Sequence, residues 1–249
     1  MENLPEGFRW DPDLTVGEET AALTRLVWPK YLIEPSDIPE PALQFEIEAI
    51  ELARRFPLWG IRQTETGCLA AYLNGALIHA DLSSNEFPDQ GWSFAIEKAY
   101  SPEIPNCLCL LVANVDPPLR KLGLSQLLLE KAKEVTAALG YSTMIAPVRP
   151  TRKHEFPAMP MSEYLKKCAE DGGIFDPWLR THARYGAEIL NVCSRSVEVK
   201  ATLAKWHAWL GVTLPRAGEC ELPGGLAPLQ IENGIGIYRE SNVWVRYRL

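Results

Sequence analysis

Two neighbouring apolar segments in the first third of the chain have the length and spacing of strands. Residues 58–63 (LWGIRQ) and 67–80 (GCLAAYLNGALIHA) are separated by the polar turn 64–67, which predicts a β-hairpin. Residues 107–115 (CLCLLVANV) are almost wholly apolar, as in a central strand that is covered on both faces.

The segment after this strand has a helical pattern. Residues 119–139 place leucine, alanine and valine on one stripe and stop at Gly140, and residues 141–148 form the next apolar run of strand length. Together, strand 107–115, helix 119–139 and strand 141–148 predict a β-α-β unit with parallel strands and a right-handed crossover. Joined to the hairpin, this unit predicts an α/β (α+β) fold with a mixed central sheet.

Helical spacing continues at both ends of the chain. Residues 18–28, 43–56 and 94–100 read as helices, and the final third reads as helix, helix, strand, helix, strand. Because no repeat, low-complexity tract or shift in composition marks a linker, we expect one domain over residues 1–249 with an elaborated C-terminal third.

Charge and composition narrow the possible partners. A net charge of −7 argues against nucleic acid, which requires a basic face. No apolar run approaches the roughly 20 residues of a membrane span, and the acidic N-terminus does not resemble a signal peptide, so we expect a cytoplasmic protein with no membrane partner. The six scattered cysteines lack metal-ligand spacing and predict free thiols without a metal site.

Residues 116–125 carry the clearest chemical signal. The first turn of a helix that follows a strand offers unpaired N–H groups and a positive dipole end, which together bind phosphates. The sequence adds two basic residues, Arg120 and Lys121, a glycine at 123 and a small Ser125. These residues suit a diphosphate, although a plain β-α turn with two solvated cations is the alternative.

This order of elements, with Arg-x-x-Gly-x-Ser at Arg120, Gly123 and Ser125, resembles the GNAT superfamily of acyl-CoA acyltransferases. The resemblance covers about residues 20–200, and Ser125 replaces the usual Gly or Ala. It implies that the fourth and fifth strands, 107–115 and 141–148, are splayed and that helices cover both faces of the sheet. It also implies a set of residues that bind acetyl-CoA or another acyl-CoA: Ala113, Val115, Arg120, Lys121, Leu122, Gly123, Leu124 and Ser125.

One subgroup of this superfamily is a closer match. Residues 146–157 (APVRPTRKHEFP), 175–186 (FDPWLRTHARYG) and 240–247 (ESNVWVRY) resemble free-standing bacterial GNAT proteins and the GNAT-like domains of polyketide loading modules. In those domains the resemblance implies decarboxylation of a malonyl thioester and transfer to a carrier-protein thiol. Thr151 and His182 match the threonine and histidine of their key polar pair.

The residues themselves leave alternatives open. His182 lies on a helix predicted to start at Asp176, on the same face as Trp178, where it could exchange a proton near neutral pH or simply be a core histidine. Thr151 could donate to a thioester or be an ordinary loop residue. Tyr185 is a candidate acid toward a leaving thiolate or a structural tyrosine.

Other charged side chains offer further choices. Arg149, Arg152 and Lys153 could bind a substrate carboxylate or an acidic carrier, or be solvated. Strand 107–115 contains no carboxylate for a general base, so Asp81 or Glu86 could substitute unless both are plain loop charges.

Three functions follow from these observations. The first is an acyltransferase that moves an acyl group from coenzyme A to an amine or thiol. The second is a malonyl-thioester decarboxylase or S-acyltransferase that loads a carrier protein, and the third is a non-catalytic acyl-CoA sensor. The acceptor is thus a small molecule or a carrier protein, and residues 221–234 could form a lid or a homodimer surface.

Overall fold

A computed structural model describes residues 4–38 and 54–249, and its strands form one mixed sheet. Along the sheet the order is β1-β2-β3-β4-β5-β9-β8-β7, and β6 pairs with the other edge of β9. The strands are β1 (Phe8–Asp11), β2 (Leu58–Gln63), β3 (Leu69–Ile78), β4 (Cys107–Val115), β5 (Thr143–Val148), β6 (Glu188–Thr202), β7 (Gly218–Cys220), β8 (Leu229–Glu232) and β9 (Ile235–Arg248).

The central elements confirm the expected β-α-β unit. The predicted hairpin is β2 and β3, the apolar run is β4, and β5 is parallel to β4. The connecting helix α5 (Leu124–Ala138) starts later than predicted, because Pro117–Leu119 form a 3-10 turn, η1, and Gly123 adopts a left-handed conformation at φ 80°. The expected mixed α/β fold class is therefore confirmed.

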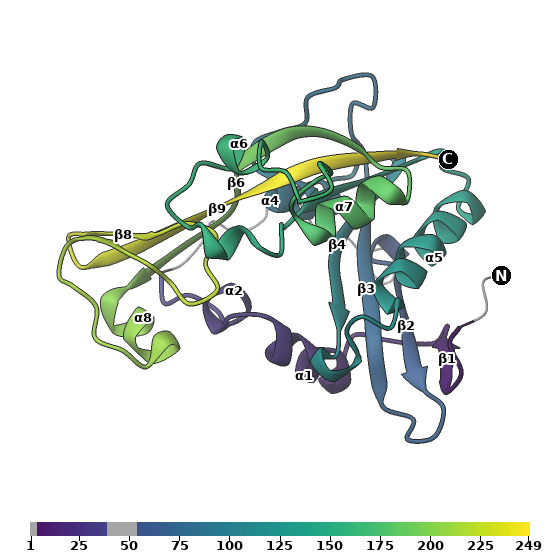
Figure 1. The fold of residues 1–249 in the computed structure, drawn as a ribbon, viewed down its shortest axis with the longest axis horizontal. Coiled ribbons are helices and arrows are strands. Elements are labelled where there is room, and N and C mark those ends of the chain that lie inside the picture. Colours follow the sequence, from purple (N-terminus) through teal and green to yellow (C-terminus); the bar gives the residue numbers. More distant parts are fainter. Residues whose placement is uncertain (1–3, 39–53) are drawn as a thin grey trace.

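The two halves of the sheet separate between β4 and β5. These strands pair only at Leu108 with Met144 and at Cys109 with Ile145. Beyond this point β5 continues along β9, whereas β4 continues along β3 with Leu111 skipped in the register, which is a β-bulge. Figure 1 shows the result: β2 to β4 lie side by side, while β6 and β9 cross them at a large angle.

Helices cover both faces of this sheet. Leu124, Leu128 and Leu129 of α5 pack with Leu108 and Met144 of the strands on one face. On the other face α4 (Gly91–Ala99) packs against alternate strand residues such as Cys109 and Ile145. The helix α1 (Glu18–Val27) packs on β3 and β4 through Leu23 and Tyr72.

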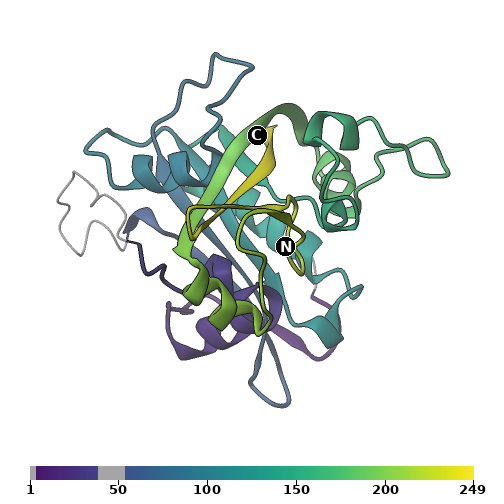
Figure 2. The ribbon, with the colours of Figure 1, turned by 90° about the vertical axis from the view of Figure 1, so that its left-hand side faces the viewer.

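The C-terminal third follows the predicted order and adds a small hairpin. Its helices are α6 (Met161–Tyr164), α7 (Pro177–Arg184) and α8 (Leu203–Leu210), with a 3-10 turn η2 (Lys153–Glu155) before them. Strands β7 and β8, and β1 near the N-terminus, were not predicted. In Figure 2, α4 and the pair α6 and α7 lie on opposite sides of β6 and β9.

The far end of β6 and β9 has its own core. Trp206 and Trp209 of α8 pack with Tyr31 of the short helix α2 (Lys30–Ile33) and with Tyr238 of β9. The helix predicted over 43–56 falls mainly on residues outside the described ranges. All six cysteines are free, as expected, and among the described helices none is long and apolar enough to cross a membrane.

Candidate active site

A cleft of about 720 Å³ opens where β4 and β5 part. Its walls come from α1, α2, β4, the start of α5, β5, α7 and β9. The residues that line it include Trp28, Leu111, Ala113, Val115, Arg120, Ser125, Arg149, Thr151, His154, Trp178, His182 and Glu240. The cleft therefore joins the turn at Arg120 to both Thr151 and His182.

At one end of the cleft, the turn before α5 presents free main-chain donors. Among the described residues, the amides of Lys121 to Ser125 donate to no backbone carbonyl, as expected for a helix start. Lys121 has φ 72° and Gly123 φ 80°, and a lysine in the left-handed region costs about 1 kcal/mol or more. A strained non-glycine residue beside open amides points to ligand binding at this turn.

Side chains around this turn are placed for an anion. Arg120 lines the cleft, Lys121 is exposed, and the space around the Gly123 Cα is open, with the Gln126 side chain 4.0 Å from the position of an added Cβ. Leu124 is buried against the core, so only its amide is available, and the Leu122 side chain is exposed to solvent. The residues present thus fit the diphosphate of a nucleotide-like ligand.

The exposed edge of β4 offers a second set of main-chain groups. The Asp116 amide donates to the Ala70 carbonyl of β3, so the alternation of an antiparallel ladder turns the amides and carbonyls of Ala113 and Val115 away from β3. Because β5 has already diverged, these groups lie along the cleft and can pair with an extended amide-bearing chain such as pantetheine.

His182 is buried deep in the cleft wall. The residue is 2% exposed, and its ring centroid lies 4.4 Å from the ring centroid of Trp178. Its Nδ1 lies 2.6 Å from the Tyr247 hydroxyl oxygen. Burial lowers the pKa of His182 to about 3, so the imidazole is neutral at neutral pH. Of the two expectations for His182, this burial favours a neutral, hydrogen-bonded ring over one that exchanges a proton near neutral pH.

Thr151 follows β5 and also lines the cleft. Its carbonyl oxygen accepts a hydrogen bond from His154 Nδ1 at 2.8 Å, and the next amide, of Arg152, donates to Asp176. Thr151 and His182 are thus brought to one cavity from segments 31 positions apart in the sequence.

The three basic residues near Thr151 have separate roles. Lys153 is 2% exposed and donates to the carbonyls of Phe156 and Leu226, and burial lowers its pKa, so it cannot reach a carrier protein. Arg152 forms an exposed pair with Glu155. Arg149 alone lines the cleft.

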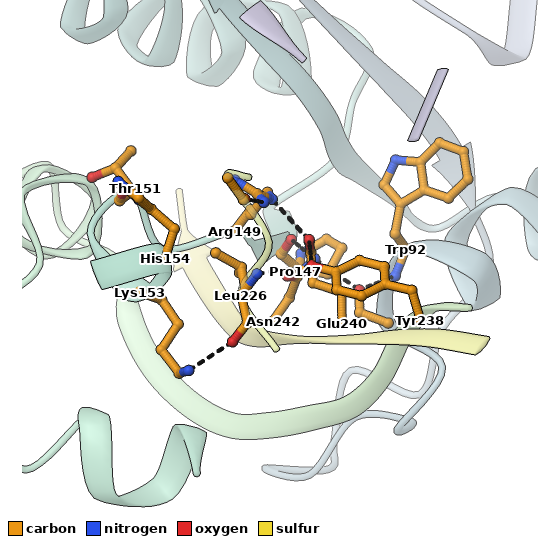
Figure 3. A network of polar contacts seen from close by, with 12 residues as sticks. Trp92, Pro147, Arg149, Thr151, Lys153, His154, Leu226, Tyr238, Glu240 and Asn242 are labelled. Carbon is orange, nitrogen blue, oxygen red and sulfur yellow. Dashed lines mark hydrogen bonds and ion pairs between the residues drawn. The ribbon is translucent and has the colours of Figure 1, made fainter. Parts of the chain in front are cut away.

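Arg149 is held by a buried carboxylate. Its Nε lies 3.0 Å from both carboxylate oxygens of Glu240, which is 1% exposed and also accepts from the Tyr238 hydroxyl at 2.8 Å. Figure 3 shows these contacts beside Asn242, with Thr151 and His154 at the other end of the network. A second bond runs from Arg149 Nη2 to the Gly224 carbonyl.

Two further candidates lie elsewhere. Tyr185 does not line the cleft within the described part of the chain, and its ring faces the Lys133 ammonium at 5.8 Å. Asp81 and Glu86 line a separate cavity of about 610 Å³ beside α4. They are therefore not placed to replace the carboxylate that β4 lacks.

Sequence reasoning missed several residues of the cleft. Trp28, whose indole donates to Asn114, and Trp92 come from distant segments, while Glu240 was noted only as part of a matching stretch. His154 looked ordinary in the sequence. For Glu240, the one available signal in the sequence is a carboxylate placed next to the predicted final strand, which is consistent with a role in the cleft.

Comparisons with known proteins agree on the fold. No family model matches the chain. The arginine N-acetyltransferase avaD of Aspergillus versicolor is 27% identical over 187 residues, which span 65% of this chain and 64% of that protein. The chain thus matches somewhat less than two thirds of this relative's length.

Two solved structures extend over nearly the whole chain. The loading GNATL domain of CurA from Lyngbya majuscula is 17% identical with a TM-score of 0.57 and covers 97% of each chain. The GphF GNAT-like decarboxylase, solved in complex with isobutyryl-CoA, is 18% identical with a TM-score of 0.52 over 92% of this chain and 93% of its own. The fold of this chain is therefore that of the GNAT superfamily.

Proposed function

We propose that this protein is an acyltransferase that moves an acyl group from coenzyme A to an amine. The observation that carries the proposal is one continuous cleft between parted strands. It runs from Arg120 and Ser125, at the turn whose amides are free, to the buried ring of His182. The sequence similarity to an arginine N-acetyltransferase supports an amine as the acceptor.

Binding of acetyl-CoA or another acyl-CoA follows from the order of groups along the cleft. Arg120, Lys121 and the amides before α5 would hold the diphosphate, and the open main-chain groups of Ala113 and Val115 would pair with the pantetheine amides. This arrangement delivers the thioester to the inner part of the cleft.

His182 then acts as a hydrogen-bond donor and not as an acid that cycles its charge. Burial raises the pKa of Tyr247, so its hydroxyl keeps the proton, and the proposal assigns this hydroxyl as the donor to Nδ1 of the neutral imidazole. In that tautomer the ring proton is on Nε2, which is then the donor that His182 offers to a ligand in the cleft. A neutral donor held in a fixed position stabilises negative charge that develops on a carbonyl oxygen.

Thr151 supplies a hydroxyl to the same reaction centre, and the oriented acceptor amine completes it. The amine attacks the thioester carbonyl carbon as the free base, and positioning replaces the missing carboxylate of β4. The C–N bond forms, the C–S bond breaks, and coenzyme A leaves as a thiolate that takes up the proton lost from the nitrogen. The proposal assigns no catalytic metal ion and gives Tyr185 no role in the cleft. It treats residues 1–249 as one domain of a cytoplasmic protein.

A second candidate, malonyl-thioester decarboxylation with loading of a carrier thiol, is favoured by one observation. Thr151 and the neutral His182 line one cavity, and a fixed donor suits an enolate as well as it suits a tetrahedral oxyanion. Against it, Lys153 is buried and Arg152 is paired, so the basic segment near Thr151 offers little to an acidic carrier surface.

One assay separates these functions. The protein is incubated with acetyl-CoA or malonyl-CoA and with amines such as arginine, and three products are followed: free coenzyme A, acylated amine and carbon dioxide. Acylated amine from acetyl-CoA supports the proposal. Carbon dioxide without acylated amine would replace it with decarboxylation, and saturable binding without turnover would leave a sensor.

A further inference from the structure

The Asp176 carboxylate bonds at once to the segment that carries Thr151 and to the helix that carries His182. Asp176 is 1% exposed. Its Oδ1 accepts from the amides of Trp178 and Leu179 at 3.0 and 3.1 Å, which caps α7. Its Oδ2 accepts from the Arg152 amide and from the Tyr164 hydroxyl, both at 2.8 Å.

The bond to Arg152 acts directly on Thr151. The peptide group between these residues is held at both ends, because the Thr151 carbonyl contacts His154 Nδ1 at 2.8 Å while the Arg152 N–H donates to Asp176. The plane of this peptide, and with it the Cα of Thr151, is thus fixed relative to Asp176.

The bonds to α7 act on His182. Asp176 is the N-cap of α7 and lies fewer than two helical turns before His182. Pro177 makes the first helical position rigid. Trp178 and His182 lie four residues apart on the same face, with their rings in an edge contact. A shift of the helix start would therefore move the imidazole.

A cap alone does not need the second oxygen. Thr202 caps α8 through a single hydroxyl oxygen that accepts from the Lys205 amide at 3.3 Å. At α7 the additional oxygen is directed to a segment 24 residues earlier in the chain. This second pair of bonds is what links two parts of the cleft wall.

We propose that Asp176 is a positioning residue that fixes the distance and orientation between Thr151 and His182. The inference rests on the proposed function for its catalytic consequence, but the link itself is a property of the folded chain. It makes the pair a preassembled unit held together by a buried carboxylate.

The variant Asp176→Asn tests this link with little change in shape. The amide oxygen still caps α7, whereas the NH₂ group that replaces Oδ2 cannot accept from the Arg152 amide. We expect kcat to fall by about tenfold to a hundredfold, while KM for acyl-CoA changes by less than about threefold. In a background of His182→Ala, Asp176→Asn should cost little more, since the two act as one unit.

Tyr164→Phe is the matched control. It removes the other bond to Oδ2 and so costs stability, yet leaves the Arg152 amide in place. We expect its kcat to stay within about threefold of the original protein. If Asp176→Asn does not fold, Asp176→Ser keeps a capping oxygen and takes its place with the same expectation.

A readout independent of turnover separates this inference from the proposed function. The ring ¹⁵N signals of His182 and the methyl signal of Thr151, followed by NMR, should both shift in Asp176→Asn and stay in place in Tyr164→Phe. Unchanged signals and unchanged kcat in Asp176→Asn would overturn the link, as would equal losses in both variants. A protein without turnover whose two signals still respond would overturn the function alone.

Discussion

The Nδ1 atom of His182 lies 2.6 Å from the hydroxyl oxygen of Tyr247, and both side chains are buried. This contact joins α7 to β9. The two residues are 65 positions apart in the sequence. Burial lowers the pKa of His182, so the imidazole of this pair is neutral at neutral pH. The pair therefore holds a neutral donor against the cleft.

Loss of the imidazole should abolish this donor. We expect His182→Ala to lower kcat by about a hundredfold to a thousandfold, the range for removal of one oxyanion donor. Acyl-CoA binding, measured by calorimetry, should stay within a few fold because the diphosphate turn is untouched. Retained kcat in a folded variant would remove His182 from the mechanism.

The low pKa of His182 makes stability depend on pH. Its pKa is about 3 in the folded chain, whereas the unfolded chain has the ordinary value near 6.5. Between these values the unfolded state binds the proton and the folded state does not, so the free energy of unfolding falls as the pH is lowered from 6.5 toward 3.

From pH 6.5 to pH 5 this contribution amounts to about 2 kcal/mol. Urea denaturation at the two pH values measures it, with His182→Gln as the reference that lacks the titrating ring. An equal loss of stability in both proteins would show that the imidazole is protonated in the folded state.

Gly123 should matter for ligand binding and not only for the backbone. Gly123→Ala strains a turn at φ 80°, at a cost of about 1 kcal/mol or more, and disturbs the amides that face the diphosphate. We expect the Kd for acyl-CoA to rise about tenfold or more. Gly140→Ala, at φ 84° beyond the other end of the same helix, carries the same strain and should leave Kd unchanged.

Arg149 and Arg152 should differ sharply in their contribution to stability. Arg149→Gln leaves the buried Glu240 without its charged partner and should lower the free energy of unfolding by about 3 kcal/mol or more. Arg152→Gln breaks an exposed pair and should cost less than about 1 kcal/mol. Thermal or urea unfolding compares them, and similar losses would contradict the buried network.

The central elements could be predicted because their signals are local. The apolar run of β4, the stripe of α5 and the apolar run of β5 each encode their own structure. The start of α5 was misplaced because proline and glycine turned residues 117–123 into a separate turn. The short strands β1, β7 and β8 are stabilised by pairing with neighbouring strands, and a local sequence pattern does not predict such pairing.

The site was only partly predictable for the same reason. The turn at Arg120 and Gly123 is contiguous, so its residue types were sufficient to suggest an anion site. The surroundings of His182 depend on Tyr247, a residue of the last strand, so its burial and its lowered pKa could not be read from neighbours in sequence. Likewise, the local sequence around Lys153 is typical of a surface cation, but the distant segment around Leu226 buries this side chain.

A crystal structure with a non-hydrolysable acetyl thioether analogue of coenzyme A would test the central claim most directly. The account predicts the diphosphate within hydrogen-bond distance of the amides of Lys121 to Ser125, and the acetyl oxygen about 3 Å from His182 Nε2. An analogue bound elsewhere, or one whose acetyl group lies far from His182 while the diphosphate occupies this turn, would contradict it.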